Sequence, residues 1–110
     1  MIHNKKYSAK KFRVLDEYID LILMGLKKST IRYGIVLVKD KFVPIESNKR
    51  EIIVKISKID YSKSFDDLDE KDAINDGFKS LSELRAKIKT FYPNISTNDP
   101  ITIINFEMVG

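Results

Sequence analysis

Residues 25–32, Gly25-Leu26-Lys27-Lys28-Ser29-Thr30-Ile31-Arg32, join an amphipathic helix to a strand, and the other predicted elements are arranged around this junction. Before it, apolar residues recur at spacings of three and four between positions 15 and 23, which predicts a helix beginning at Asp16. Gly25 suits the end of that helix, because glycine adopts a positive φ without a steric penalty. Residues 29–33 favour an extended segment.

Further strands are expected on both sides of the junction. Apolar and β-branched runs predict strands at 12–15, 35–38, 42–45, 51–59 and 101–109. The apolar alternation of the last strand slips near Ile104, and a bulge there is one explanation. Helices are expected to fill the interval between the last two strands. Ser64 can begin a short helix over 65–68, a second helical stretch covers 69–75, and Ser80 with Glu83 forms a capping-box pattern before a helix over 81–91.

The order of these elements predicts an α+β fold. Strands outnumber helices and cluster in the middle of the chain, so we expect a mostly antiparallel, partly closed sheet with helices on one side. A parallel, doubly wound sheet is the alternative, and it would need a regular alternation of strands and helices that this sequence lacks.

The composition excludes several classes of function. The chain has 110 residues, the size of one domain, and no cysteine, so neither disulfides nor thiolate metal sites are expected. Its one histidine is His3, which argues against a histidine metal site or a Ser-His-Asp triad. No apolar run approaches the length of a membrane span or of a signal-peptide core. We therefore expect a cytoplasmic protein with no membrane partner, metal or organic cofactor.

Positive charge is concentrated at the N-terminus. Residues 1–13 carry five basic residues and no acidic one, whereas residues 61–78 carry two basic and six acidic residues. We expect residues 1–11 to be a flexible basic tail and residues 12–110 to be the folded domain. Such a tail is compatible with a polyanionic partner, and an aid to solubility is the alternative.

Three blocks of sequence together resemble the ASCH family. The first is residues 25–32, where a glycine ends a helix and a lysine and a Thr-Ile-Arg tripeptide follow. The second covers residues 69–78 and 80–84, and the third joins Phe91-Tyr92-Pro93 to Asp99 and residues 101–107. The resemblance spans about residues 12–109. It implies a PUA-like β-barrel with a cleft between barrel and helices, and a role in binding RNA.

One branch of the family consists of small metal-free amidohydrolases that remove the acyl group from N4-acetylcytidine. Lys27, Thr30 and Asp76 match the lysine, threonine and acidic residue of that branch, although the acidic residue there is usually glutamate. The resemblance implies attack by the Thr30 hydroxyl, deprotonation assisted by Lys27 and proton transfer by the acid. Aspartate is one methylene shorter than glutamate, and an ion pair with Asp76 would keep Lys27 protonated; both features weaken the catalytic interpretation.

The residues themselves predict a small polar cluster. Alternation along a strand turns Thr30 and Arg32 to one side and Ile31 to the core, and Lys27 can fold back over the same opening. A hydroxyl, a guanidinium and an ammonium suit an anion or a polarised carbonyl. Thr30 and Asp76 could instead be ordinary strand and turn residues. The partner of Arg32 could be internal, with Asp76 or Glu107 as candidates.

Aromatic residues could extend this cluster. Tyr33 and Phe78 are candidates for stacking a base at the cleft rim, with core packing as the alternative, favoured for Phe78.

Three functions remain open. The first is a module that binds RNA, a nucleoside or a nucleotide through Lys27, Thr30, Arg32, Tyr33 and Asp76. The second is the amidohydrolase, with Lys27, Thr30 and Asp76 as catalytic residues. The third is an adaptor that contacts a protein through the acidic residues 66–76. The sequence does not indicate an oligomeric state.

Overall fold

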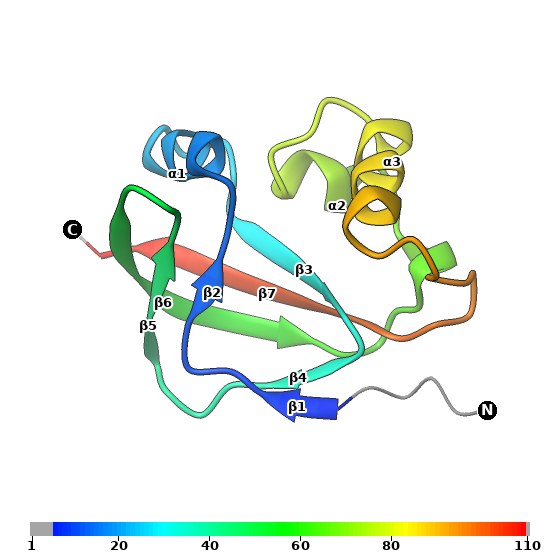
Figure 1. Cartoon of the computed structure of the whole chain (residues 1–110), viewed down its shortest axis with the longest axis horizontal. Coiled ribbons are helices and arrows are strands. Elements are labelled where there is room, and N and C mark those ends of the chain that lie inside the picture. Colours follow the sequence, from blue (N-terminus) through cyan, green and yellow to red (C-terminus); the bar gives the residue numbers. More distant parts are fainter. Residues whose placement is uncertain (1–5, 110) are drawn as a thin grey trace.

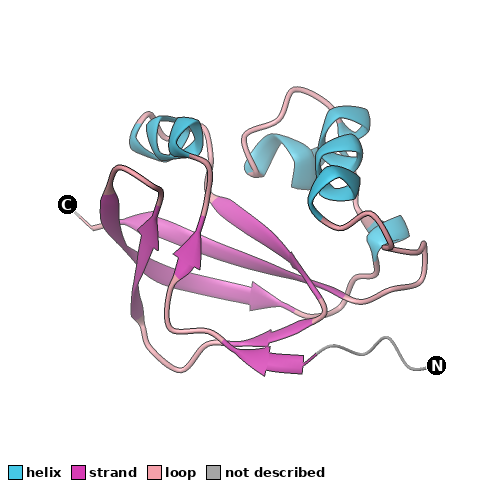
Figure 2. Cartoon of the chain, in the orientation of Figure 1, coloured by secondary structure: helices cyan, strands magenta, loops and turns pink. Residues whose placement is uncertain are grey.

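The computed structural model describes residues 6–109 and contains the predicted succession of strands and helices (Figures 1 and 2). The strands are β1 (Lys6–Ser8), β2 (Phe12–Arg13), β3 (Ser29–Tyr33), β4 (Ile35–Leu37), β5 (Phe42–Glu46), β6 (Glu51–Asp60) and β7 (Ile101–Met108). The helices are α1 (Asp16–Leu23), the 3-10 helix η1 (Phe65–Asp67), α2 (Glu70–Asn75) and α3 (Leu81–Phe91).

The main sheet has five strands in the order β2-β5-β6-β7-β3, and it curls into a half-barrel. The pairs β5–β6, β6–β7 and β3–β7 are antiparallel, whereas β2 joins β5 in parallel. Helices α1, α2 and α3 lie along one side of the sheet (Figure 2). The predicted α+β, mostly antiparallel and partly closed architecture is confirmed.

Strand β7 lies between two hydrophobic clusters. Ile104 and Phe106 belong to the cluster inside the half-barrel, which α1 covers, whereas Ile101 and Ile103 belong to the cluster under α2 and α3. Residues Ile101 to Ile104 are all buried for this reason. The lost alternation near Ile104 therefore reflects burial on both faces.

The irregularity in pairing lies on the neighbouring strand. The register between β6 and β7 shifts between Ile56 and Lys58, so Ser57 is the extra residue. The bulge considered for Ile104 is thus in β6. It also explains why the apolar positions of β6 change phase between Ile56 and Ile59.

Part of the expected N-terminal tail forms a short strand. Lys6–Ser8 pair in parallel with Ile35–Leu37, and these two strands form a short second sheet. Residues 6–8 of the expected tail therefore lie in a strand, whereas residues 1–5, which include Lys5 and His3, lie outside the described part. Of the basic residues that follow, Lys11 and Arg13 both form ion pairs with Glu46.

The acidic segment is engaged within the domain. Asp67 and Ser64 form a capping box on η1, and Asp69 and Asp72 form another on α2. Asp72 also forms an ion pair with Lys63 at 2.6 Å. The carboxylate of Glu70 accepts from the backbone N–H of Leu81 at the start of α3. These contacts leave less of the segment available as a protein-binding surface.

The helices are short. None of the helices within residues 6–109 has the length and apolar character needed to cross a membrane.

Candidate functional site

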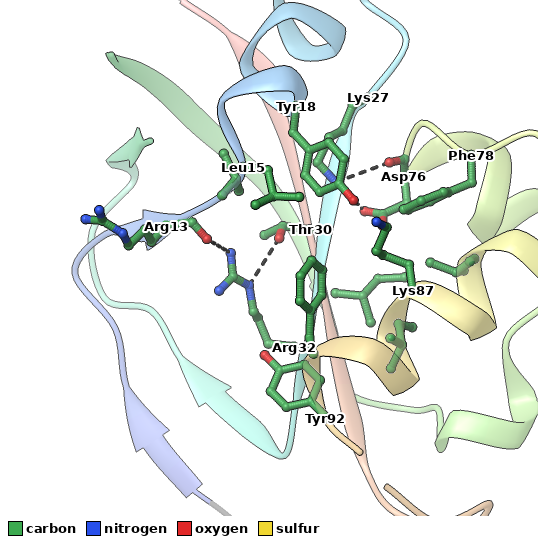
Figure 3. Close-up of a pocket in the computed structure, with 15 residues that line it drawn as sticks. Arg13, Leu15, Tyr18, Lys27, Thr30, Arg32, Asp76, Phe78, Lys87 and Tyr92 are labelled. Carbon is green, nitrogen blue, oxygen red and sulfur yellow. Dashed lines mark hydrogen bonds and ion pairs between the residues drawn. The ribbon is translucent and has the colours of Figure 1, made fainter. Parts of the chain in front are cut away.

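A pocket of about 380 Å³ opens between the two edge strands of the half-barrel and the helices (Figure 3). Strands β2 and β3 supply one wall, and α1, the end of α2 and α3 supply the others. Most of the lining is apolar or aromatic, as is usual for sites that hold small molecules. The lining residues are Arg13, Val14, Leu15, Tyr18, Lys27, Thr30, Ile31, Arg32, Asp76, Phe78, Leu84, Lys87, Ile88, Phe91 and Tyr92.

Lys27 and Asp76 form a buried ion pair at one end of this pocket. The Lys27 ammonium donates to Oδ1 of Asp76 at 2.9 Å and to the Asp76 carbonyl at 3.2 Å. The hydroxyl of Ser29 donates to the same Oδ1 at 3.0 Å. Lys27 and Asp76 are 3% and 5% exposed, so the pair is shielded from solvent.

Two turns bring these residues together. Gly25 has φ +76° and ends α1, which directs the chain toward β3. The backbone N–H of Lys28 donates to the carbonyl of Asn75 at 2.7 Å, which fixes the end of α2 against this junction. Gly77 has φ +93°, and a Cβ at this position would lie 3.1 Å from the Cβ of Lys27. Both the conformation and the close approach therefore favour glycine after Asp76.

Burial acts on both members of the pair. It lowers the pKa of Lys27, an effect that the neighbouring Asp76 carboxylate opposes. Burial likewise raises the pKa of Asp76, and hydrogen bonds from Lys27 and Ser29 oppose that shift. An opposite charge in direct contact favours the charged state of each group.

Thr30 and Arg32 form the second polar group, as strand alternation predicts. The Nε of Arg32 donates to the Thr30 hydroxyl oxygen at 3.1 Å, and Nη2 donates to the carbonyl of Arg13 at 2.9 Å. The guanidinium also lies 5.2 Å from the centre of the Phe12 ring. Arg32 therefore links the two edge strands, β2 and β3, by its side chain.

The internal carboxylate partner considered for Arg32 is not found. Neither Asp76 nor Glu107 forms an ion pair with it among residues 6–109, because a backbone carbonyl and a hydroxyl take its donors. The Nη1 group of Arg32 makes no hydrogen bond to another described residue. It remains a donor for a bound molecule.

The structure places the two aromatic residues predicted at the cleft rim, Phe78 and Tyr33, differently. Phe78 lines the pocket and packs edge-to-face on Tyr18, with ring centres 6.1 Å apart. Tyr33 is not among the residues that line the pocket, although Ile31, on the same face of β3, is. The Tyr33 hydroxyl donates to Asp99 at 2.8 Å and its ring packs on Tyr92.

The structure thus brings together Lys27, Thr30, Arg32 and Asp76 in the lining of one pocket, and Tyr33 lies outside that lining. Sequence reasoning missed Tyr18, Ser29, Lys87 and the carbonyl of Arg13. Tyr18 belongs to the apolar stripe of α1, which is usually a sign of core packing, and no local pattern distinguishes the others. Residues 6–109 contain no cluster of histidine, aspartate and glutamate side chains arranged to hold a metal ion.

The pocket offers hydrogen-bond donors and acceptors in separate places. Arg32 Nη1 and the Thr30 hydroxyl can donate at the β3 wall, and Oδ2 of Asp76 can accept at the other end. Aromatic rings stand between them (Figure 3). This arrangement suits a flat, polar molecule that is both a donor and an acceptor.

Comparison with solved structures identifies the fold. The crystal structure of an ASCH domain from Lactobacillus crispatus JV V101 matches with a TM-score of 0.72 and 19% identity, covering 93% of this chain and 79% of that one. A crystal structure of a hypothetical protein matches with a TM-score of 0.66 and 24% identity, covering 96% of this chain and 100% of that one. At these identities the similarity shows the fold alone.

Comparison of sequences adds little about activity. No protein-family model matches the chain. A phosphoglycerate kinase from Borrelia garinii subsp. bavariensis is 32% identical over 107 residues, which is 96% of this chain and 25% of that protein. The chain therefore spans about a quarter of this relative's length. The findings together give the chain the fold of an ASCH domain, as the resemblance of its sequence implies.

Proposed function

We propose that this ASCH-type fold is a binding module that holds RNA, or a nucleoside or nucleotide, in the pocket between β2, β3 and the helices. The observation that carries the proposal is the meeting of Lys27, Thr30, Arg32 and Asp76 in a pocket with aromatic walls. A nucleobase can stack on such walls, which contributes about 1–3 kcal/mol per base in single-stranded complexes. The role in RNA binding that the family resemblance implies supports the same conclusion.

The charges of the lining favour an anionic or polar ligand. Four basic side chains face one carboxylate, and two of them, Arg13 and Lys27, are already paired. Arg32 and Lys87 form no ion pair among the described residues. A phosphate near Arg32 would receive a charge-assisted hydrogen bond.

Binding can be tested with a matched pair of threonine variants. Titrations measure the affinity of the wild type, Thr30→Val and Thr90→Val for a short single-stranded RNA and for the four nucleosides. Thr90 donates to the carbonyl of Ala86 on α3 and does not line the pocket. We expect Thr30→Val to weaken binding and Thr90→Val to leave it unchanged.

The dependence on salt separates the two kinds of ligand. Binding of single-stranded RNA through phosphates weakens with salt, with a slope of about 0.7 per phosphate neutralised, whereas binding of an uncharged nucleoside does not. A folded wild-type protein that binds neither RNA nor any nucleoside or nucleotide at millimolar concentration would refute the proposal.

Amidohydrolysis of an acylated cytidine is the second candidate, because Lys27, Thr30 and Asp76 line the same pocket. The hydrogen bonding of these residues opposes the reaction. Lys27 donates to Asp76, and the Thr30 hydroxyl oxygen accepts from Arg32. No base among the described residues is positioned to take the proton of the Thr30 hydroxyl. Incubation with N4-acetylcytidine, followed by chromatography, tests this reaction. Cytidine release that disappears in Thr30→Val would establish it, and the absence of release from folded protein would exclude it.

A further inference from the structure

Phe91 places an aromatic ring at the mouth of the pocket. It is the last residue of α3 and lines the pocket, yet it is 48% exposed and belongs to neither hydrophobic cluster. Leu84 and Ile88 precede it at helical spacing and are buried, so the apolar face of α3 continues past the core before the helix ends. The ring is therefore available to a bound molecule.

A second exposed apolar residue belongs to the same lining. Leu15 lies just before α1, lines the pocket and is 41% exposed. Single exposed apolar side chains are common on protein surfaces and need no explanation. Two of them in the lining of one pocket, one being an aromatic ring, indicate a surface that a ligand covers.

A cation stands beside the Phe91 ring. Lys87 also lines the pocket, and its Nζ lies 5.9 Å from the centre of the ring. The two residues are four positions apart, so they are neighbours on one face of α3. Lys87 forms no ion pair within residues 6–109. The mouth thus combines an exposed ring with an ammonium that has no counterion.

This combination suits the repeating unit of single-stranded RNA. Such a strand alternates flat bases with phosphates, and proteins bind it by stacking bases on aromatic rings and pairing phosphates with basic side chains. A free nucleoside has one base and no phosphate. With its base inside the pocket, it would leave both Phe91 and Lys87 unused.

We propose that Phe91 and Lys87 form a second subsite at the mouth, where Phe91 stacks the base next to the one inside the pocket and Lys87 binds the phosphate that joins them. The inference rests on the proposed binding function. It narrows the ligand to an RNA strand of two or more nucleotides and adds residues that no sequence pattern assigned to the site.

Removal of the ring tests the stacking contact. Phe91→Leu deletes the aromatic ring and keeps an apolar side chain with good helix propensity. Phe42→Leu is the matched control, because Phe42 on β5 is 51% exposed and does not line the pocket. Titrations compare each nucleoside monophosphate with the dinucleoside monophosphate of the same base, which has one more base and no more phosphate. Thermal unfolding shows that each variant is folded.

The wild type should gain affinity from the second base. We expect it to bind the dinucleoside monophosphate about five- to hundredfold more tightly than the mononucleotide, the effect of one stacked base. Phe91→Leu should lose most of this advantage, and Phe42→Leu should keep it. The ratio of the two affinities is taken within each variant, so it reports the second base alone.

A pair of lysine variants tests the phosphate contact. Lys87→Gln should reduce the slope of single-stranded RNA affinity with salt by about 0.7, the share of one phosphate. Lys89→Gln is the control, because Lys89 lies two residues further along α3 and outside the lining, and it should leave the slope unchanged. An unchanged slope in Lys87→Gln would overturn the assignment of the phosphate.

The outcomes distinguish the subsite from the function on which it rests. If the wild type binds mononucleotides but gains nothing from a second base, or if Phe91→Leu keeps the full advantage, the subsite at the mouth is wrong and the binding pocket stands. If the folded wild type binds neither nucleosides, nucleotides nor RNA, both proposals are wrong.

Discussion

Asp76→Asn should strongly destabilise the protein, because it leaves a buried ammonium without its counterion. Lys27 is 3% exposed, and its hydrogen bond to the Asp76 carboxylate is 2.9 Å long. Removing one partner of a buried ion pair typically lowers the free energy of unfolding by about 3–5 kcal/mol. We expect a loss in this range at pH 7.

Deprotonation of Lys27 sets an upper bound on this loss. The variant can fold with a neutral lysine, and deprotonating an amine with the ordinary lysine pKa of 10.5 costs about 4.8 kcal/mol at pH 7. The same calculation gives about 2 kcal/mol at pH 9. Burial lowers the pKa of Lys27 in the folded protein below its ordinary value of 10.5. The unfolded chain therefore binds the proton more tightly, and the free energy of unfolding falls as pH falls below 10.5. The effect of Asp76→Asn should therefore shrink as pH rises.

Urea unfolding at pH 7 and pH 9 measures this effect. The chain has no tryptophan, so far-UV circular dichroism or tyrosine fluorescence can follow the transition. The double variant Lys27→Met/Asp76→Asn removes both charges and should recover most of the loss. Asp20→Asn is the control, because its ion pair with Arg50 is exposed and should contribute less than about 1 kcal/mol.

A small, pH-independent effect would contradict this reasoning. If Asp76→Asn lowers stability by less than about 1 kcal/mol at both pH values, the Lys27 ammonium is not confined by burial as described.

Three further predictions concern the surroundings of the pocket. Gly77→Ala should destabilise the protein by about 1–2 kcal/mol in urea unfolding, because alanine is strained at φ +93° and its Cβ would crowd Lys27. Arg32→Lys should lower stability by about 1–2 kcal/mol and weaken RNA binding, because one ammonium cannot reproduce both hydrogen bonds, whereas an unchanged Tm would contradict the link between β2 and β3. Hydrogen bonds from Arg50 and Ser47 lower the pKa of Asp16 below 3.8, so its contribution is present above this pH and lost below it. Asp16→Asn should therefore make Tm less sensitive to pH as the pH falls below 3.8, which thermal unfolding at a series of acidic pH values measures.

Local patterns were sufficient for most of the fold. The apolar spacing before Gly25 located α1, and the Ser80 signal located the start of α3. The predicted position of the bulge was wrong. The isoleucines of β7 are buried on both faces of the strand, so the apolar pattern does not distinguish the two faces. The pairing of Lys6–Ser8 with β4 could not be predicted, since it depends on residues far along the chain.

The parts of the candidate site that depend on the spacing of residues along a strand could be predicted from the sequence. Thr30 and Arg32 share a face of β3, and the family resemblance pointed to Lys27 and Asp76. The same alternation places Tyr33 on the opposite face of β3, with Ile31. Ile31 still lines the pocket, so alternation alone does not decide whether Tyr33 does. The hydroxyl of Tyr18 and the carbonyl that Arg32 reaches depend on tertiary contacts that no local pattern records.

The position of β7 in the sheet has a consequence for synthesis of the chain. Strand β3, which carries Thr30 and Arg32, pairs within the main sheet with β7 alone, and Ile101 is made 68 residues after Tyr33. At about 5–20 residues per second, this strand waits roughly 3–14 s for its partner. Lys27 likewise precedes Asp76 by 49 positions. During this interval an apolar strand edge is exposed on the growing polypeptide, where chaperones are expected to bind first.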